Sequence, residues 1–507
     1  MVSTSNPPDR LQTAYEAAEA RYKAANPGSG AAHETATAHL PGGNTRSVLH
    51  WAPYPLSIAA AAGFTLRDAD GHAYTDLLGE YSAGLYGHSH PVLLAALADT
   101  ASRGLSYGGP HAAEARLAGL VCARFFRGGG TGMETVRFTN SGTEANLMAI
   151  AAAKTYTGRY RGKVMVFDGA YHGGVLAFPF GCAGVWNNDN NRGGEGEKDG
   201  ERAENRKSEK YRLLRALNAP HDFLVATYND IASVDALIDS VASTTEREDD
   251  DEHEHGLAAI LIEPMLGSGG GICATPAFLA HLRRRANEAG ALLIFDEVMT
   301  SRMHSGGGLQ STLDVRPHMT TLGKYLGGGM SFGAFGGEPD IMALFDPRSN
   351  KLPHAGTFNN NVLTMNVGAA GLAEVFTPAV AEELHALGEE LREKLNALGD
   401  ATTAIGTESE GNRGWKLRAL GRGSIIVIHF TRAEVEDIAS PRDFSDEDMR
   451  VLDLFHLEML NEGFYLARRG YIALSIAFLE DGGRGQLDEF VGAVERFVKR
   501  LRDLFEG

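Results

Sequence analysis

The chain has 507 residues, of which 43% are hydrophobic and 22% charged, so it is long enough for two or three domains. Its net charge of −18 argues against nucleic acid or an anionic membrane as the main partner. The three cysteines are too few and too far apart to predict a disulfide framework or a metal site. Because we find no secretory leader and no apolar run near ~20 residues, we expect a cytoplasmic protein without a membrane span.

The first 80 residues predict a helix and a β-hairpin. Apolar residues recur at helical spacing over residues 9–25, and residues 26–28 predict the end of that helix. Alternation over residues 64–78, with a turn at 70–71, predicts the hairpin. Between them stands Arg46 in a Gly-rich loop, which is either a surface charge or a planar clamp for a carboxylate.

Helical segments at 91–103 and 112–126 precede a long alternation of apolar runs and helices. The predicted strands are 136–138, 163–167, 223–226, 257–262 and 291–295, with helices ending at 156 and spanning 276–289. Each strand ends on polar residues, and strand alternates with helix. The pattern therefore predicts a large doubly wound α/β domain with a mostly parallel sheet.

The C-terminal part of the chain has a different composition of elements. Its predicted helices are 362–376, 379–398, 446–462 and 486–505, and its predicted strands are 424–430 and 471–476. This order predicts a smaller α+β domain. We expect residues 1–80 to contribute to this small domain, residues 81–350 to form the large one, and residues 351–507 to form the rest of the small one.

Two stretches interrupt the large domain. Residues 187–210 are almost free of apolar side chains, and residues 244–255 are a run of acids and histidines. Such compositions cannot bury enough surface to order themselves, so both predict flexible insertions. The second either binds a metal weakly or is a solvated charge run, and the solvated run is the more common case.

Two residues near the centre of the sequence suggest chemistry. Asp296 ends the apolar run 291–295, and Lys324 lies in a Gly-rich loop. Pyridoxal phosphate (PLP) requires a lysine for its Schiff base and an acid beside its pyridinium nitrogen. Taken singly, an acid at a strand end is more often a cap or turn residue, and a lysine in a loop is usually a solvated surface charge.

Two further stretches fit the same cofactor. Ser141, Gly142 and Thr143 follow a strand and open a helix, which is a phosphate-binding arrangement or a plain N-cap. Tyr171 follows the strand 163–167 beside glycines, where it could stack on a flat ring or pack under a loop.

Taken together, these motifs resemble one family. They are Ser141-Gly142-Thr143-Glu144-Ala145, Tyr171-His172-Gly173, Asp296-Glu297-Val298, Gly323-Lys324 and Gly356-Thr357-Phe358. In this order they resemble the class III aminotransferases, which are fold-type I PLP enzymes and include glutamate-1-semialdehyde aminomutase. The resemblance covers nearly the whole chain apart from the two insertions.

The resemblance implies a role for each motif residue. Lys324 would form the Schiff base and move the proton, Asp296 would pair with the ring nitrogen, and Tyr171 and Val298 would flank the ring. Asn229 would lie near the ring hydroxyl. Ser141, Gly142 and Thr143 would hold the phosphate, and Thr357 would reach the phosphate of a neighbouring subunit. A homodimer follows from this resemblance, with the site at its interface and no metal.

Within the family, the segments around Arg46 and Arg469 look most like β-amino acid (β-phenylalanine type) aminotransferases. There Arg46 would bind the β-amino acid carboxylate and Arg469, rather than Arg468, the α-carboxylate of 2-oxoglutarate or pyruvate. Tyr81 and Ser82 would line the side-chain pocket. The implied reaction is a ping-pong transamination through the pyridoxamine form. Two alternatives stay open at this point, namely an aminomutase and an inactive scaffold homologue.

Overall fold

The computed structural model describes residues 10–125, 133–182, 216–218, 220–244, 255–305, 307–349, 351–401, 415–432, 435–444 and 446–506. The chain forms two compact units. The first comprises residues 1–91, 383–437 and 444–507, and the second comprises residues 92–382 and 438–443. The predicted insertion 187–210, and the insertion 244–255 apart from its two end residues, lie outside the described residues.

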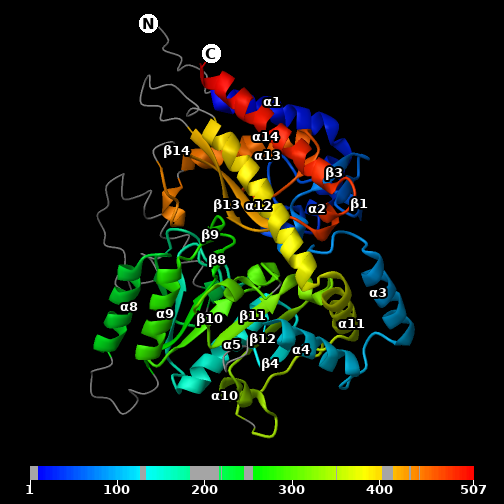
Figure 1. The fold of residues 1–507 in the computed structure, drawn as a ribbon. Helices are drawn as coiled ribbons and strands as arrows, with labels where there is room; N and C mark the ends of the chain where they lie inside the picture. Colours follow the sequence, from blue (N-terminus) through cyan, green and yellow to red (C-terminus); the bar gives the residue numbers. More distant parts are fainter. Residues whose placement is uncertain are drawn as a thin grey trace. The chain divides into compact units, whose positions relative to one another are not determined.

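The second unit is built on a seven-stranded sheet in the order β4-β12-β11-β10-β7-β5-β6. Figure 1 labels β4, β12, β11 and β10 of this sheet. Its strands are β4 (Thr135–Thr139), β5 (Lys163–Phe167), β6 (Phe223–Ala226), β7 (Leu257–Ile262), β10 (Leu292–Asp296), β11 (Met319–Gly323) and β12 (Gly333–Gly337). Strand β12 is antiparallel to β4 and β11, and the other pairings are parallel. The predicted mostly parallel sheet is therefore confirmed. A short hairpin of β8 (Met265–Leu266) and β9 (Ile272–Cys273) follows β7.

Helices cover both faces of this sheet because its strands are apolar on both sides. Val164 and Val166 share a buried cluster with Ala149 of α5, whereas the Phe167 ring meets Phe278 of α9 at 5.6 Å. The helices of this unit are α3 (Pro91–Arg103), α4 (Ala112–Phe125), α5 (Gly142–Thr157), α8 (Ile231–Thr244), α9 (Pro276–Glu288), α10 (Pro339–Met342) and α11 (Val362–Ala370). The predicted helix 362–376 is α-helical only to its ninth residue and continues as a π-helical turn over Gly371–Val375.

The first unit holds two smaller sheets and the terminal helices. One sheet has the order β1-β2-β3-β15 and the other the order β13-β14-β16. The strands are β1 (Ile58–Ala62), β2 (Thr65–Asp68), β3 (Ala73–Asp76), β13 (Trp415–Arg422), β14 (Ile425–Arg432), β15 (Phe464–Tyr465) and β16 (Tyr471–Ala473). The helices are α1 (Arg10–Ala25), α2 (Pro27–Thr37), α13 (Asp446–Asn461), α14 (Gly483–Glu506) and the part of α12 (Pro378–Ala401) from residue 383 onward. In Figure 1, α1 lies beside α14 and packs on α13.

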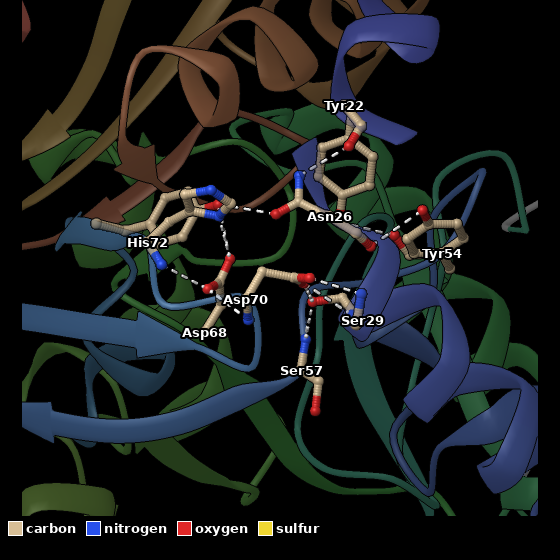
Figure 2. A network of polar contacts seen from close by, with 10 residues as sticks. Tyr22, Asn26, Ser29, Tyr54, Ser57, Asp68, Asp70 and His72 are labelled. Atoms are coloured by element: carbon tan, nitrogen blue, oxygen red, sulfur yellow. Dashed lines mark hydrogen bonds and ion pairs between the residues drawn. The ribbon is translucent and has the colours of Figure 1, made fainter. Parts of the chain in front are cut away.

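Helix α2 begins at Pro27, within residues 26–28, where the sequence predicts the end of a helix. Asp70, in the turn between β2 and β3, accepts hydrogen bonds from the backbone N–H groups of Gly28 (2.6 Å) and Ser29 (2.9 Å). Figure 2 shows Asp70 beside Ser29. The first N–H groups of a helix have no intrahelical acceptor, so a carboxylate from a distant turn can cap them. Burial opposes ionisation of Asp70, but these hydrogen bonds keep its pKa below its usual value. Pro27 is compatible with the first helical position.

None of the helices in the described ranges has the length and hydrophobicity needed to cross a bilayer.

Candidate active site

Asp296 is the last residue of β10, and its buried carboxylate accepts three hydrogen bonds. Oδ2 accepts from Asn146 Nδ2 and from the ring nitrogen Nδ1 of His172, both at 2.8 Å, and Oδ1 accepts from the N–H of Val298 at 2.9 Å. Asn146 is held in turn by Thr321, whose hydroxyl donates to Asn146 Oδ1 at 2.6 Å. These donors fix the orientation of the carboxylate.

Lys324 follows β11, the neighbour of β10. The two strands are parallel, and Asp296 pairs with Thr321. Asp296 and Lys324 therefore both lie at the carboxyl-terminal edge of the sheet, where α/β proteins bind ligands. Lys324 has a φ of +56°, a left-handed conformation that costs a non-glycine residue on the order of 1 kcal/mol. Backbone strain of this kind is found at positions where a side chain must point in one direction.

The N-terminus of α5 lies close to the same strand ends. Ser141 caps the helix by accepting from the N–H of Glu144 at 3.2 Å, so the N-cap interpretation is confirmed. A Cβ atom at Gly142 would lie 2.8 Å from both Val298 methyl carbons, and one at Gly323 would lie 3.1 Å from one of them. A side chain at Gly142 would therefore displace Val298 from the helix terminus, and one at Gly323 would be a tight fit. The helix N-terminus also remains a favourable place for an anion.

Tyr171 exposes 49% of its surface, although it follows a buried strand. Its backbone N–H donates to Glu263 Oε1 at 2.9 Å, while Glu263 Oε2 accepts from the N–H of Gly267 at 3.0 Å. Glu263 is fully buried, and burial raises its pKa to about 7, with His172 lowering the pKa and Asp296 raising it. Sequence reasoning assigned no role to Glu263, His172 or Asn146. An acid before a proline at a strand end, and an asparagine within an Ala-rich helix, were the available signals.

Asn229 has a φ of +60° and bridges three backbone groups. Its Nδ2 donates to the carbonyl oxygens of Cys273 (3.1 Å) and Ala439 (3.0 Å), and its Oδ1 accepts from the N–H of Thr275 (3.0 Å). Both amide hydrogens are thus engaged, which leaves one lone pair on Oδ1 for a ligand. Its role beside a ring hydroxyl stays a prediction.

Thr357 is exposed, and its neighbour Phe358 exposes 59% of its surface. Both residues therefore lie outside the buried core. Its predicted contact with a neighbouring subunit's phosphate stays a prediction.

The first unit contains the predicted carboxylate-binding residues. The guanidinium carbons of Arg46 and Arg469 lie 5.5 Å and 5.7 Å from the centre of the Tyr81 ring. Arg46 also forms an ion pair with Glu80, a residue that sequence reasoning did not single out. Ser82, which follows Tyr81 in the chain, is buried. The structure therefore brings these predicted residues together.

Arg468 and Arg469 differ in their surroundings. Arg468 is paired with Asp453, with Nη2 2.8 Å from Oδ2. Arg469 instead lies over the Tyr81 ring. This difference favours Arg469 as the residue that meets a ligand.

The residues of the second unit match the chemical groups of PLP. A lysine amine, an oriented carboxylate, a helix N-terminus and an exposed aromatic ring correspond to its aldehyde, ring nitrogen, phosphate and ring face. The close approach of Val298 to two glycines adds an apolar surface beside them. The fold and the site thus define a PLP enzyme of fold-type I.

The comparison with protein families gives the same class. The family model "Aminotransferase class-III" matches residues 49–180 and 195–439, which is more than half of the chain. The chain therefore belongs to the class III aminotransferases and is a PLP-dependent transaminase, as its motifs led us to expect.

Similar proteins are found by sequence and by structure. A beta-phenylalanine transaminase from Variovorax paradoxus is 42% identical over 478 residues, covering 94% of each chain. The structure of a beta-phenylalanine aminotransferase from the same organism covers 97% of this chain and 98% of that one, with a TM-score of 0.80 at 41% identity. An omega-transaminase from Sphaerobacter thermophilus has a TM-score of 0.74 at 31% identity, covering 94% of this chain and 98% of that one. A glutamate-1-semialdehyde aminomutase from Pseudomonas aeruginosa covers 98% of both chains at 20% identity and a TM-score of 0.75, which shows a shared fold.

We expect Glu263→Gln to change how stability depends on pH. Burial raises the pKa of Glu263 in the folded protein to about 7. The folded state therefore holds a proton that the unfolded chain releases at lower pH. The stability that this proton contributes is fully present below the unfolded pKa and is lost as pH rises through about 7. Gln stays neutral. Between pH 5 and pH 8, the wild type should therefore lose roughly 2 kcal/mol relative to the variant, measured by urea unfolding.

Glu389→Gln is the matched control. Burial raises the pKa of Glu389, but hydrogen bonds from Gly423 and Arg392 more than offset this and lower it. Its ionised form is therefore already favoured at pH 5, and the control should show no relative gain in stability up to pH 8. A Glu263→Gln variant whose stability relative to the wild type is the same at both pH values would contradict the buried neutral acid.

Proposed function

We propose that this transaminase moves an amino group from a β-amino acid, including aromatic ones, to 2-oxoglutarate or pyruvate. The observation that carries the proposal is the pair of guanidinium groups, Arg46 and Arg469, on the Tyr81 ring. Arginine binds carboxylates through two parallel hydrogen bonds, and an aromatic face suits an apolar side chain. The 42% identical relative named as a beta-phenylalanine transaminase supports the same donor class.

Each predicted residue has a role in this proposal. When bound, PLP would supply an aldehyde that a lysine amine can hold and a ring that withdraws electrons from the donor's reacting carbon. Lys324 would supply that amine and carry a proton away from and back to the substrate. Asp296 would hold a negative charge beside the ring nitrogen, oriented by Asn146 and His172. Tyr171 and Val298 would flank the ring, and Asn229 would lie near its hydroxyl.

Phosphate binding would fall to the helix terminus. Ser141, Gly142 and Thr143 stand where α5 offers N–H groups without intrahelical acceptors. The Ser141 hydroxyl accepts a hydrogen bond from Glu144 and keeps its own proton for a ligand. In the first unit, Arg46 would bind the donor carboxylate and Arg469 the α-carboxylate of the keto acid, with Tyr81 and Ser82 lining the side-chain pocket.

We expect Lys324→Ala to keep PLP but to lose transamination. Without the amine, no group carries the proton, so the rate of a single turnover with β-phenylalanine should fall by more than about 10²-fold. Borohydride reduction followed by mass spectrometry provides a second measurement. It should attach a pyridoxyl group to Lys324 in the wild type and to no lysine in the variant.

Lys351→Ala, which removes an exposed lysine, is the matched control and should retain both the turnover and the label at position 324. Turnover by Lys324→Ala at the wild-type rate would remove Lys324 from the chemistry.

A homodimer is the second part of the proposal. Thr357 is exposed on a polar loop beside the exposed Phe358, which suits a residue that serves a second copy of the chain. We propose that Thr357 contributes to the phosphate site of the partner subunit.

Mixed dimers of Lys324→Ala and Thr357→Ala subunits test this assignment. If Thr357 acts across the interface, one site of each mixed dimer has both residues intact. Co-expressed subunits should then recover up to about a quarter of the wild-type activity at limiting PLP. If Thr357 serves its own subunit, both sites stay defective and mixing should restore nothing.

A further inference from the structure

Arg46 already has a carboxylate partner within the chain. Its guanidinium forms an ion pair with Glu80, and the two side chains are 43% and 56% exposed. An exposed ion pair is weak because water screens both charges. A carboxylate arriving from solution can therefore take the place of Glu80 at little cost in desolvation.

The backbone holds Glu80 in this position at an energetic cost. Glu80, Tyr81 and Ser82 all have left-handed conformations, with φ values of +48°, +52° and +74°. Consecutive left-handed residues other than glycine persist only where the surroundings enforce them, and they cluster at binding sites. Asp76 stabilises the residues before this turn by accepting hydrogen bonds from the N–H groups of Leu78 (2.9 Å) and Gly79 (3.1 Å).

Tyr81 connects the turn to both arginines. Its ring stacks on Tyr471 with centres 5.7 Å apart and planes inclined by 25°. Its other contacts include the guanidinium groups of Arg46 and Arg469. The strained turn therefore fixes an aromatic ring and a carboxylate beside the same arginine.

Glu80 has room to leave Arg46. It lines a cavity of about 410 Å³, which is also lined by His33 and Asn44. Both side chains can donate hydrogen bonds to a carboxylate. The lining is mainly apolar, but the Glu80 side chain is 56% exposed, so it can rotate away from Arg46 toward solvent.

We propose that Glu80 is a specificity-determining residue that competes with the donor's carboxylate for Arg46. A donor with a carboxylate displaces Glu80. With a donor that has none, Glu80 stays in place and neutralises Arg46, so no bare charge faces an apolar group. Glu80 thus weakens the binding of β-amino acids and widens the range of amines accepted. This inference rests on the proposed function.

The test compares two amino donors, β-phenylalanine and 1-phenylethylamine. Both carry an amine beside a phenyl ring, but only β-phenylalanine has a carboxylate. In Glu80→Gln, the KM for β-phenylalanine should fall roughly two- to fivefold, the size expected from removing one exposed ion pair. The KM for 1-phenylethylamine should stay the same or rise. In an Arg46→Ala background, Glu80→Gln should no longer change the KM for β-phenylalanine, because the competition has no target.

Two further variants complete the experiment. Glu19→Gln removes an exposed ion pair with Lys23 and the same charge, and it should alter neither KM. Glu80→Asn provides a second neutral side chain, since asparagine tolerates left-handed backbone, and it should reproduce Glu80→Gln if that variant folds poorly.

The outcomes separate the two proposals. A wild type that turns over 1-phenylethylamine but not β-phenylalanine overturns the proposed donor and this inference together. A wild type active on β-phenylalanine, with its KM unchanged or raised in Glu80→Gln, overturns the competitor role alone. A raised KM would instead indicate that Glu80 holds Arg46 in position for the substrate.

Discussion

Asp296 places a carboxylate at the end of a fully buried strand, where an unpaired charge would cost several kcal/mol. Hydrogen bonds from Asn146, His172 and the N–H of Val298 offset that cost. The donors come from α5, from the segment after β5 and from the residues after β10, so the requirement to satisfy one charge holds three elements together. The same requirement explains the buried, polar Asn146 within an Ala-rich helix.

Much of the large sheet could be predicted from local sequence. Strands β5, β6 and β7 begin and end where predicted, because each is an apolar run of strand length that stops at polar residues. The place of β12, antiparallel between β4 and β11, depends on contacts between distant segments and leaves no local signal. Helix α2 was missed for a similar reason, since its cap comes from Asp70 in a turn far along the chain.

The residues of the candidate site likewise differ in how well the sequence predicts them. Lys324 and Asp296 stand out in the sequence because they follow apolar runs and lie among residues that open a loop. The partners that orient them do not stand out, because their role follows from burial. Glu263 is an example: its carboxylate binds the N–H of Tyr171 only once the loop after β5 has folded against β7. Likewise, the ion pair of Arg46 and Glu80 arises from a left-handed turn that no residue preference predicts.

The central claim is that this transaminase takes its amino group from β-amino acids. A spectral titration of the PLP-loaded wild type tests it most directly, with β-phenylalanine and a panel of β-, α- and ω-amino donors. We expect β-amino acids to convert the cofactor absorbance to that of the pyridoxamine form and 2-oxoglutarate or pyruvate to reverse the change. A response to α- or ω-amino donors alone would contradict the assignment of Arg46 as the residue that binds the carboxylate of a β-amino acid.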